Sequence, residues 1–305
     1  MDTMLILIRQ ILQMFLLAGV GFLLFRCGKV TRESSRALGN ILIYVALPAV
    51  IVNGFLVERT EEHLWGILIS AGAAAVLLLL SVLVSRLFFR KDAVAAFAGA
   101  FSNPGFFGVP LMIASVGQGS VFYAASFIAF LNIGQWTYGV SVLTGQSPLA
   151  GFRLKKLVRA PFMIAVLVGL FLFLTQLRLP DVVSGCLSFA AGLNTPLAMF
   201  TVGIYLAQTD FRRMTARRSN YTVSLVRLLV VPLVSLLVLS LLPSSLRSMK
   251  AVLLLASACP VGSNVAVYAQ LHGNDSAYAV ETVVMSTLFS LVTIPAVVYL
   301  SSLVW

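Results

Sequence analysis

Residues 101–110 of the chain read FSNPGFFGVP, and residues 259–264 read CPVGSN. Each stretch lies inside a longer apolar run, at 93–116 and 250–271. A proline within a helix removes a backbone donor and clashes with the preceding turn, and glycine relaxes the backbone further. The two stretches therefore predict two interrupted helices, whose freed backbone groups must find other partners.

The composition around these stretches assigns the chain to the membrane. Of its 305 residues, 60% are hydrophobic and only 10% are charged, whereas an average soluble domain is about 25% charged. Roughly 20 apolar residues in a helix cross the hydrocarbon core. Runs of that kind occur near 4–25, 37–57, 64–89, 93–116, 120–144, 161–177, 182–206, 221–242, 250–271 and 277–303. They are continuous and too long for barrel strands of about 10 residues. We expect an all-α polytopic membrane protein with ten transmembrane helices.

The charge pattern predicts the orientation. Most of the 21 lysines and arginines lie in the loops after the first, third, fifth and seventh runs. Basic residues collect in cytoplasmic loops, so we expect these loops inside and both termini outside a cell membrane, of the bacterial inner-membrane type. The net charge of +11 then indicates no nucleic-acid partner. The three cysteines show no CxxC spacing, so neither a disulfide framework nor a metal site is expected.

The chain divides into two halves at its longest basic loop. Residues 145–160 separate a first five-helix repeat (1–144) from a second (161–305). Because each half holds an odd number of helices, the second enters the membrane from the opposite side, as in an inverted repeat. Pro48 and Pro196 form one pair of landmarks at similar offsets, and Pro104 and Pro260 form another. We expect two inverted five-helix repeats.

The matched interruptions indicate a transporter binding site near the membrane midplane. Half-helices that restart after Pro104 and Pro260 would direct positive dipole ends and free N–H groups toward a cavity. Neutral polar groups and a small residue beside the prolines complete the candidate site: Asn103, Gly105, Ser263 and Asn264. These features favour a polar or anionic substrate. The alternative is a pair of proline kinks capped by Ser and Asn, with no ligand.

Other amides lie within the apolar runs. Asn132 and Gln135 share one helix face at a spacing of three residues and are candidates to line the same cavity. The alternative is interhelical hydrogen bonding, which stabilises membrane bundles modestly. For Asn40, Asn53 and Asn194 we favour that alternative.

Few charges fall inside the runs. Arg9 and Arg227 lie about 8–9 Å from their helix starts, at 1.5 Å per residue, and we favour snorkelling to an interface over a place in the cavity. Glu281 is a candidate coupling residue that protonates during transport, although we favour a simple complement to its helix N-terminus. Because no other carboxylate is expected in the bilayer, proton coupling is favoured over Na⁺. A neutral-oxygen Na⁺ site stays open, and no cofactor is expected.

The sequence offers no enzyme site. His63 and His272 fall in loops expected on opposite sides of the membrane, and no Asp lies inside a run. A Ser-His or Asp-dyad site therefore has no partners. The HExxH, phosphate-loop and haem-binding CxxCH motifs are also missing from the sequence. We expect a protein that is not an enzyme.

Four pieces of the chain match a known pattern. They are Leu47-Pro48-Ala49, residues 103–110, residues 194–200 with Gly203, and Pro260 with Asn264. In them the chain resembles the auxin efflux carrier family, within the bile acid/sodium symporter-like superfamily. That family includes plant auxin exporters and bacterial carriers of malonate and malate.

The resemblance implies an architecture and a mechanism. Helices 4 and 9 would cross at Pro104 and Pro260, while Asn103 and Asn264 would bind the substrate carboxylate. Helices 1, 2, 6 and 7 would form a scaffold, and helices 3–5 and 8–10 a moving domain. Transport would be elevator-like, often in a homodimer joined through the scaffold. The short loop at 145–160 resembles the compact bacterial members, so auxin is not the expected substrate.

The leading hypothesis is therefore a carrier of a small organic anion, a mono- or dicarboxylate, that works by alternating access. One alternative is a carrier of neutral or aromatic metabolites. Another is a receptor on the same fold that binds a ligand without flux, although the 305 residues show no sensor or effector domain.

Overall fold

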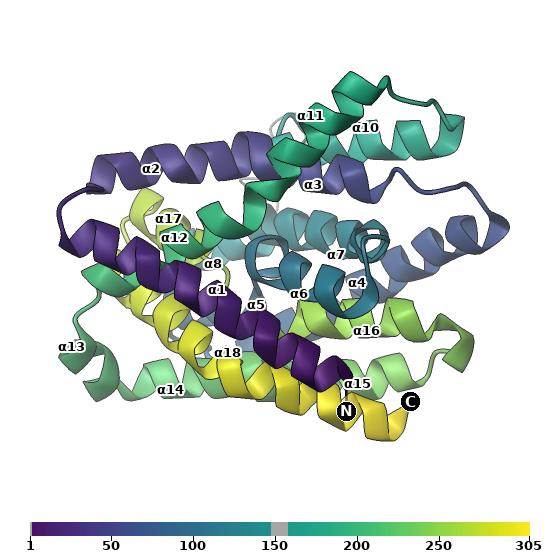
Figure 1. Ribbon diagram of the computed structural model, residues 1–305. Helices are drawn as coiled ribbons and strands as arrows, with labels where there is room; N and C mark the ends of the chain where they lie inside the picture. The colour runs from purple at the N-terminus through teal and green to yellow at the C-terminus, as the bar shows by residue number, and fades with distance from the viewer. Residues whose placement is uncertain (1, 148–157) are drawn as a thin grey trace.

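The computed structural model describes residues 2–147 and 158–305, and within these ranges every regular element is a helix (Figure 1). The centre of the predicted basic linker, 148–157, lies outside the described residues. One isolated backbone bridge, between Ser102 and Val261, joins two segments that are not helical. The all-helical prediction is confirmed.

Residues 2–147 form eight helices and three π-helical turns. The helices are α1 (Asp2–Arg26), α2 (Arg32–Ile41), α3 (Leu47–Gly54), α4 (Glu61–Phe88), α5 (Ala93–Ala100), α6 (Val109–Val116), α7 (Ser120–Gly134) and α8 (Val140–Thr144). The π-helical turns are Leu42–Ala46, Pro104–Gly108 and Gln135–Gly139. The first turn joins α2 to α3, the second leads into α6, and the third joins α7 to α8.

The second half repeats this mixture of long and interrupted helices. Its helices are α10 (Pro161–Thr175), α11 (Asp181–Gly192), α12 (Asn194–Gln208), α13 (Phe211–Ala216), α14 (Arg218–Leu225), α15 (Val231–Ser240), α16 (Arg247–Ala258), α17 (Asn264–Leu271) and α18 (Ser276–Val304). A π-helical turn, Val226–Val230, joins α14 to α15, and a 3₁₀ turn, Ser244–Leu246, precedes α16.

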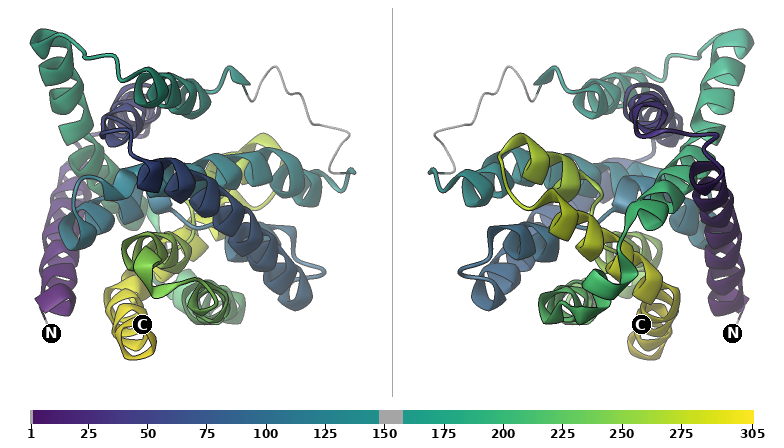
Figure 2. Two further views of the ribbon diagram at one scale, coloured as in Figure 1. Left: turned by 90° about the vertical axis from the view of Figure 1, so that its right-hand side faces the viewer. Right: turned by 90° about the vertical axis from the view of Figure 1, so that its left-hand side faces the viewer.

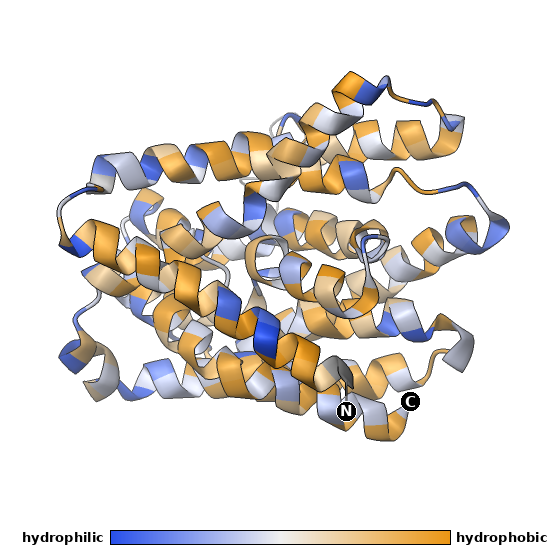
Figure 3. Cartoon of the chain, in the orientation of Figure 1, coloured by the Kyte–Doolittle hydropathy of each residue, from blue (hydrophilic) through white to orange (hydrophobic). Residues whose placement is uncertain are grey.

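Six of the described helical segments are long and apolar enough to cross a membrane: Met4–Arg26, Glu33–Gly54, Glu61–Phe88, Asp181–Gln208, Arg218–Ser240 and Ser276–Val304. Two shorter apolar helices, Pro104–Val116 and Pro161–Thr175, accompany them. Figure 3 shows apolar residues along most of these helices, with hydrophilic residues concentrated at turns and ends. The chain is thus a multi-pass membrane protein.

Prolines explain three of the π-helical turns. Proline cannot donate to the carbonyl four residues earlier and its ring clashes there, and a π turn widens the helix at that point. Pro48, Pro110 and Pro232 each lie four residues after a member of a π turn, namely Tyr44, Phe106 and Leu228. The helices therefore continue through these prolines without ending.

Pro196 has a different effect on the run at 182–206, which was expected to be one helix. The chain divides it at Leu193 into α11 and α12. Pro196 has no N–H for the carbonyl of Gly192, which is the last residue of α11. The predicted span is confirmed as one apolar helical segment, Asp181–Gln208, with a single turn residue at Leu193 before Asn194 begins α12.

Two groups of helices lie side by side. In one group α3 contacts α10 and α11, α2 contacts α12, and α1 packs along α12. In the other, α5 and α16 are almost wholly buried among α4, α7, α14, α15 and α18. Figure 2 shows α10 and α11 standing outward from this second group.

The contact between α1 and α12 depends on two glycines. A Cβ added at Gly203 would lie 1.9 Å from the Ala18 carbonyl oxygen, and one at Gly21 would lie 2.4 Å from the Phe200 carbonyl oxygen. Small residues let membrane helices approach this closely and gain van der Waals contact. The two helices therefore form a tight pair.

Candidate functional site

The two predicted helix interruptions lie against each other at the centre of the molecule. Helix α5 ends at Ala100 and α16 at Ala258, and the chain then becomes extended in both places. The Asn103 N–H donates to the Pro260 carbonyl at 2.9 Å, and the Gly262 N–H donates to the Phe101 carbonyl at 3.0 Å. We call residues 101–104 and 259–263 the crossover. The backbone hydrogen bonds of the crossover satisfy some of the N–H and C=O groups that have no helical partner next to the prolines.

Helix α18 supports the crossover from one side. The Ser286 hydroxyl accepts a hydrogen bond from the Val261 N–H at 3.0 Å. Ser286 in turn donates to the Val283 carbonyl of its own helix. The extended segment after α16 is therefore held by both a backbone and a side-chain partner.

Both helices restart at the crossover with N-termini that lack a side-chain cap within the described residues. One restart runs from Pro104 through the π turn into α6, and the other is α17 from Asn264. Proline suits the first position because it has no N–H there. At α17 the Val265 and Ala266 N–H groups donate to the Gly262 and Ser263 carbonyls at 3.1 and 3.3 Å. The other N–H groups of the two starts and their positive dipole ends form a favourable site for an anion.

Gln135 and Asn264 meet at the start of α17. The Asn264 Nδ2 donates to the Gln135 Oε1 at 3.1 Å. Gln135 is only 1% exposed and begins a π turn, a feature that recurs at functional sites. Its Nε2 has no hydrogen-bond partner among the described residues. A buried donor without a partner costs free energy, so this amide is suited to a ligand.

Two further polar groups lie beside the crossing segments: Ser102, which was not among the sequence candidates, and Asn194, which makes the kind of interhelical bond favoured from the sequence. Asn194, for which simple interhelical bonding was favoured, donates from Nδ2 to the Gly105 carbonyl at 3.1 Å. Its buried Oδ1 and the buried Ser102 hydroxyl have no partner in the described part of the chain. The Gly-Leu-Asn-Thr-Pro sequence at 192–196 was the available signal for Asn194, since it ends one helix and starts another.

The other predicted site residues have different places. Asn103 is buried at the crossover and Ser263 is half-buried beside Asn264. Pro104, Gly105 and Pro260 lie in the crossing segments or directly after them. Asn132 donates from Nδ2 to the Ile128 carbonyl of its own helix at 2.8 Å, so its amide is engaged locally.

Arg227 does not snorkel, contrary to the interpretation favoured from the sequence. It is 1% exposed. Its Nη1 donates to the Ala100 carbonyl at 3.1 Å, and its Nη2 donates to the Ser257 carbonyl. The position of Arg227 along its helix predicts only its distance from the membrane interface. The side chain lies on the helix face that points into the bundle. Arg9 is exposed on α1, as snorkelling requires.

Glu281 lies in an ionic cluster near the start of α18. The Arg213 Nε lies 3.2 Å from Oε1, the Arg217 Nε lies 3.5 Å from Oε2, and the Asn220 Nδ2 donates to Oε2 at 3.1 Å. The same arginines pair with the exposed Asp275. Burial acts to raise the pKa of Asp275, but the Tyr278 N–H and the two guanidinium groups outweigh it and lower that pKa below its usual value.

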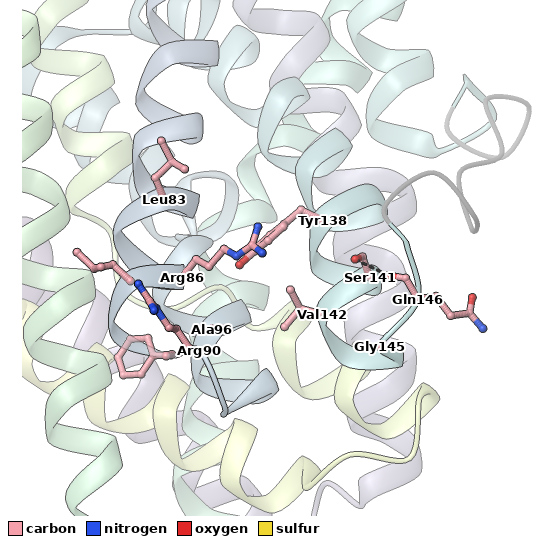
Figure 4. A pocket seen from close by; sticks show the side chains of 11 residues that line it. Leu83, Arg86, Arg90, Ala96, Tyr138, Ser141, Val142, Gly145 and Gln146 are labelled. Atoms are coloured by element: carbon pink, nitrogen blue, oxygen red, sulfur yellow. Dashed lines mark hydrogen bonds between the residues drawn. The ribbon is translucent and has the colours of Figure 1, made fainter.

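A separate cavity of about 730 Å³ opens between the end of α4, α5 and α8 (Figure 4). Polar side chains that line it are Arg86, Arg90, Tyr138, Ser141 and Gln146. The crossover residues are not part of its lining. In the described residues, no group of three or more His, Cys, Asp or Glu side chains is placed to hold a metal ion.

Comparison with known proteins now assigns the chain to a family. A sequence model of the family described as "Membrane transport protein" matches residues 6–148 and 147–298. The chain belongs to this membrane transport protein family. The match confirms the resemblance to the auxin efflux carriers, and it makes the protein a transporter and not an enzyme.

One relative covers nearly the same length. The chain is 27% identical over 306 residues to a protein of Rhizobium meliloti (strain 1021) named "Putative malonate transporter". The alignment covers 95% of this chain and 94% of that protein. The similarity therefore extends over both interrupted helices and the segments that hold them.

Proposed function

We propose that this member of the membrane transport protein family is a secondary transporter of a small organic anion. The substrate is a mono- or dicarboxylate, and malonate is the first candidate because the relative from Rhizobium meliloti carries that name. The observation that carries the proposal is the crossover itself. Two helix N-termini without a side-chain cap begin there, beside the Nε2 of Gln135, which has no partner among the described residues. The crossing segments contain no acidic side chain.

The proposed architecture is ten transmembrane helices in two inverted five-helix repeats. The interruptions at Pro104 and Pro260, which occupy matching places in the two halves, support it. The grouping of α1–α3 with α10–α12 supports a scaffold, and the remaining helices would carry the crossover in an elevator-like movement. The Asn194 bond to the Gly105 carbonyl joins the two groups and would break in each cycle.

Orientation, assembly and coupling complete the proposal. Both termini would lie outside the cell membrane, as the basic loops indicate. A homodimer would form through the scaffold, where α11 has no buried residue in the single chain. Coupling to protons is favoured over Na⁺. Glu281 stays a weak candidate for that role, since it is engaged by Arg213 and Arg217.

Transport by purified protein in liposomes tests this function. Labelled malonate, with unlabelled mono- and dicarboxylates as competitors, should enter wild-type vesicles with saturation. Asn264→Ala should lower uptake at limiting substrate by about tenfold, since it removes a bond at the site, whereas Asn132→Ala should leave it within about twofold. Saturable binding without uptake would favour a receptor. Uptake of neutral or aromatic metabolites alone would contradict the anion assignment.

A further inference from the structure

Arg227 occupies the point where both interrupted helices end. Its Nη1 donates to the Gly99 carbonyl at 3.3 Å and the Ala100 carbonyl at 3.1 Å, in the last turn of α5. Its Nη2 donates to the Ser257 carbonyl, in the last turn of α16. One guanidinium therefore caps the C-termini of both helices, where orphan carbonyls and the negative dipole ends lie.

The Ser81 hydroxyl helps to fix this guanidinium in place. The Nη1 of Arg227 donates to the Ser81 hydroxyl at 3.0 Å, and Ser81 donates to the Ala100 carbonyl at 2.7 Å. The Ser235 and Ser257 hydroxyls lie 2.6 Å apart and bond to each other. Arginine suits this role because its planar fork can bond several carbonyls at once.

The charges at the crossover can be counted. Each helix end carries about half an elementary charge, negative at the C-terminus and positive at the N-terminus. The ends of α5 and α16 together carry about −1, which Arg227 balances. The starts of Pro104–Val116 and of α17 together carry about +1. A ligand with one negative charge would balance this positive charge.

Other charged groups lie elsewhere. Glu281 is paired with Arg213 and Arg217, and Asp92 caps α5 at its far end. The remaining titratable side chains on the elements that contact the crossing helices are Arg9 and Arg26 on α1, Glu61, Glu62, His63 and Arg86 on α4, Tyr123 on α7, Tyr138 in the π turn after α7, Tyr205 on α12, Arg218 and Tyr221 on α14, Arg247 and Lys250 on α16, Cys259 after it, Tyr268 on α17, and Tyr278 and Tyr299 on α18. Arg9 is exposed on the surface of α1, and the other ionic members of this set stand at helix ends.

We propose that Arg227 is the charge-balancing and positioning residue of the crossover, and that it restricts the carrier to substrates with one negative charge. A monocarboxylate qualifies as it stands, and a dicarboxylate qualifies when one carboxyl group is protonated. The inference rests on the proposed function and names the charge state of its substrate.

The Gln135 amide matches such a substrate. The Nε2 of Gln135 is a donor suited to a single carboxylate and has no partner among the described residues. A dianion would bring a second negative charge to helix starts that supply about one positive charge. A dicarboxylate would therefore take up one proton from solution on entry and release it on the far side, so the substrate itself carries the coupled proton.

Binding as a function of pH tests the charge rule on the wild-type protein. Malonate is compared with malonamate, its half-amide, which stays a monoanion from about pH 5 to pH 8. The Kd of malonamate should stay constant, whereas the apparent Kd of malonate should rise about tenfold per pH unit above its second ionisation. A malonate Kd that stays flat or tightens would overturn the inference. If neither compound binds or is transported, the proposed function fails and the inference fails with it.

Two variants test the role of Arg227. Arg227→Gln should weaken malonamate binding by about tenfold or more, as loss of a buried hydrogen-bonded charge does. Neutral malonamide should bind the wild type only weakly, at millimolar concentrations, and that weak binding should change by less than about twofold. Arg227→Lys should recover most of the malonamate affinity. Ser235→Ala, an uncharged change beside Ser257, is the matched control and should bind malonamate normally. Equal losses for malonamate and malonamide would indicate a purely structural role and overturn the proposal. If Arg227→Gln does not fold, the wild-type pH comparison decides.

Discussion

The Nδ2 of Asn264 donates a hydrogen bond to the Oε1 of Gln135 across 3.1 Å. The bond joins the start of α17 to the π turn after α7, which lies 129 residues away in the sequence. Because the Oε1 is occupied, the Gln135 amide presents its free Nε2. The pair therefore combines a helix N-terminus with a fixed side-chain donor.

Gln135 and Asn264 should act as one unit in binding. Gln135→Ala and Asn264→Ala should each raise the Kd for a carboxylate by about tenfold, and the double variant should be little worse than either, since contacting residues are not additive. Isothermal titration of the four proteins measures this. Asn132→Ala, on the same helix but bonded to Ile128, is the control. Additive losses from the two single changes would show that the residues act separately.

The sequence was sufficient to locate the two helix breaks, because proline and glycine act locally on the backbone. It was also sufficient to name Asn103, Asn264 and Gln135 as candidates. It could not show that Gln135, and not Asn132, reaches α17. Both amides lie on one helix face, and only the tertiary packing and the π turn at Gln135 direct one to the crossover and leave the other on its own helix.

Removal of the Ser102 hydroxyl should weaken ligand binding, whereas removal of the Ser81 hydroxyl should lower the stability of the fold. The Ser102 hydroxyl has no partner among residues 2–147 and 158–305, so Ser102→Ala should leave the thermal midpoint unchanged and weaken carboxylate binding by about threefold. Ser81 bonds to both Arg227 and the Ala100 carbonyl, so Ser81→Ala should cost about 1–3 kcal/mol of stability. Thermal unfolding in detergent, with binding assays alongside, separates the two effects. A destabilised Ser102→Ala with normal binding would count against a ligand at that hydroxyl.

Gly203 should not tolerate a methyl group. Its added Cβ would lie 1.9 Å from the Ala18 carbonyl oxygen, so α1 and α12 would have to separate. Gly203→Ala should destabilise the protein by about 1–3 kcal/mol, as overpacking does. Gly19→Ala is the control, since no atom lies within 4 Å of that Cβ. The two variants are compared by their thermal midpoints, and equal midpoints would argue against the tight helix pair.

The carboxylate of Asp275 should contribute stability only above acidic pH. Its pKa in the folded protein lies below that of an ordinary aspartate, so the contribution is present above the unfolded-state pKa and is lost as the pH falls through the folded-state pKa. Asp275→Asn keeps a capping side chain and removes the charge. Its thermal midpoint should lie slightly below that of wild type at neutral pH, and the difference should close in acid. The effect is small because the side chain is 44% exposed. A difference that is independent of pH would rule out the ionic contribution.

The inward direction of the Arg227 side chain could not be predicted from the sequence. Counting residues from the helix start gave a short distance to the interface, and that distance is compatible with snorkelling. The direction of the side chain depends on which helix ends lie opposite it. Gly99, Ala100 and Ser257 come together with Arg227 only in the folded chain. No local pattern in the sequence carries that information.

We propose that the transported anion binds at the crossover and not in the cavity at Arg86. The most direct measurement is saturable binding of labelled malonate to the purified protein, compared among wild type, Asn264→Ala and Arg86→Ala. Wild type and Arg86→Ala should bind with similar Kd values, and Asn264→Ala should bind about tenfold more weakly or worse. Wild-type affinity in Asn264→Ala, together with loss of binding in Arg86→Ala, would contradict the account and move the site to the cavity.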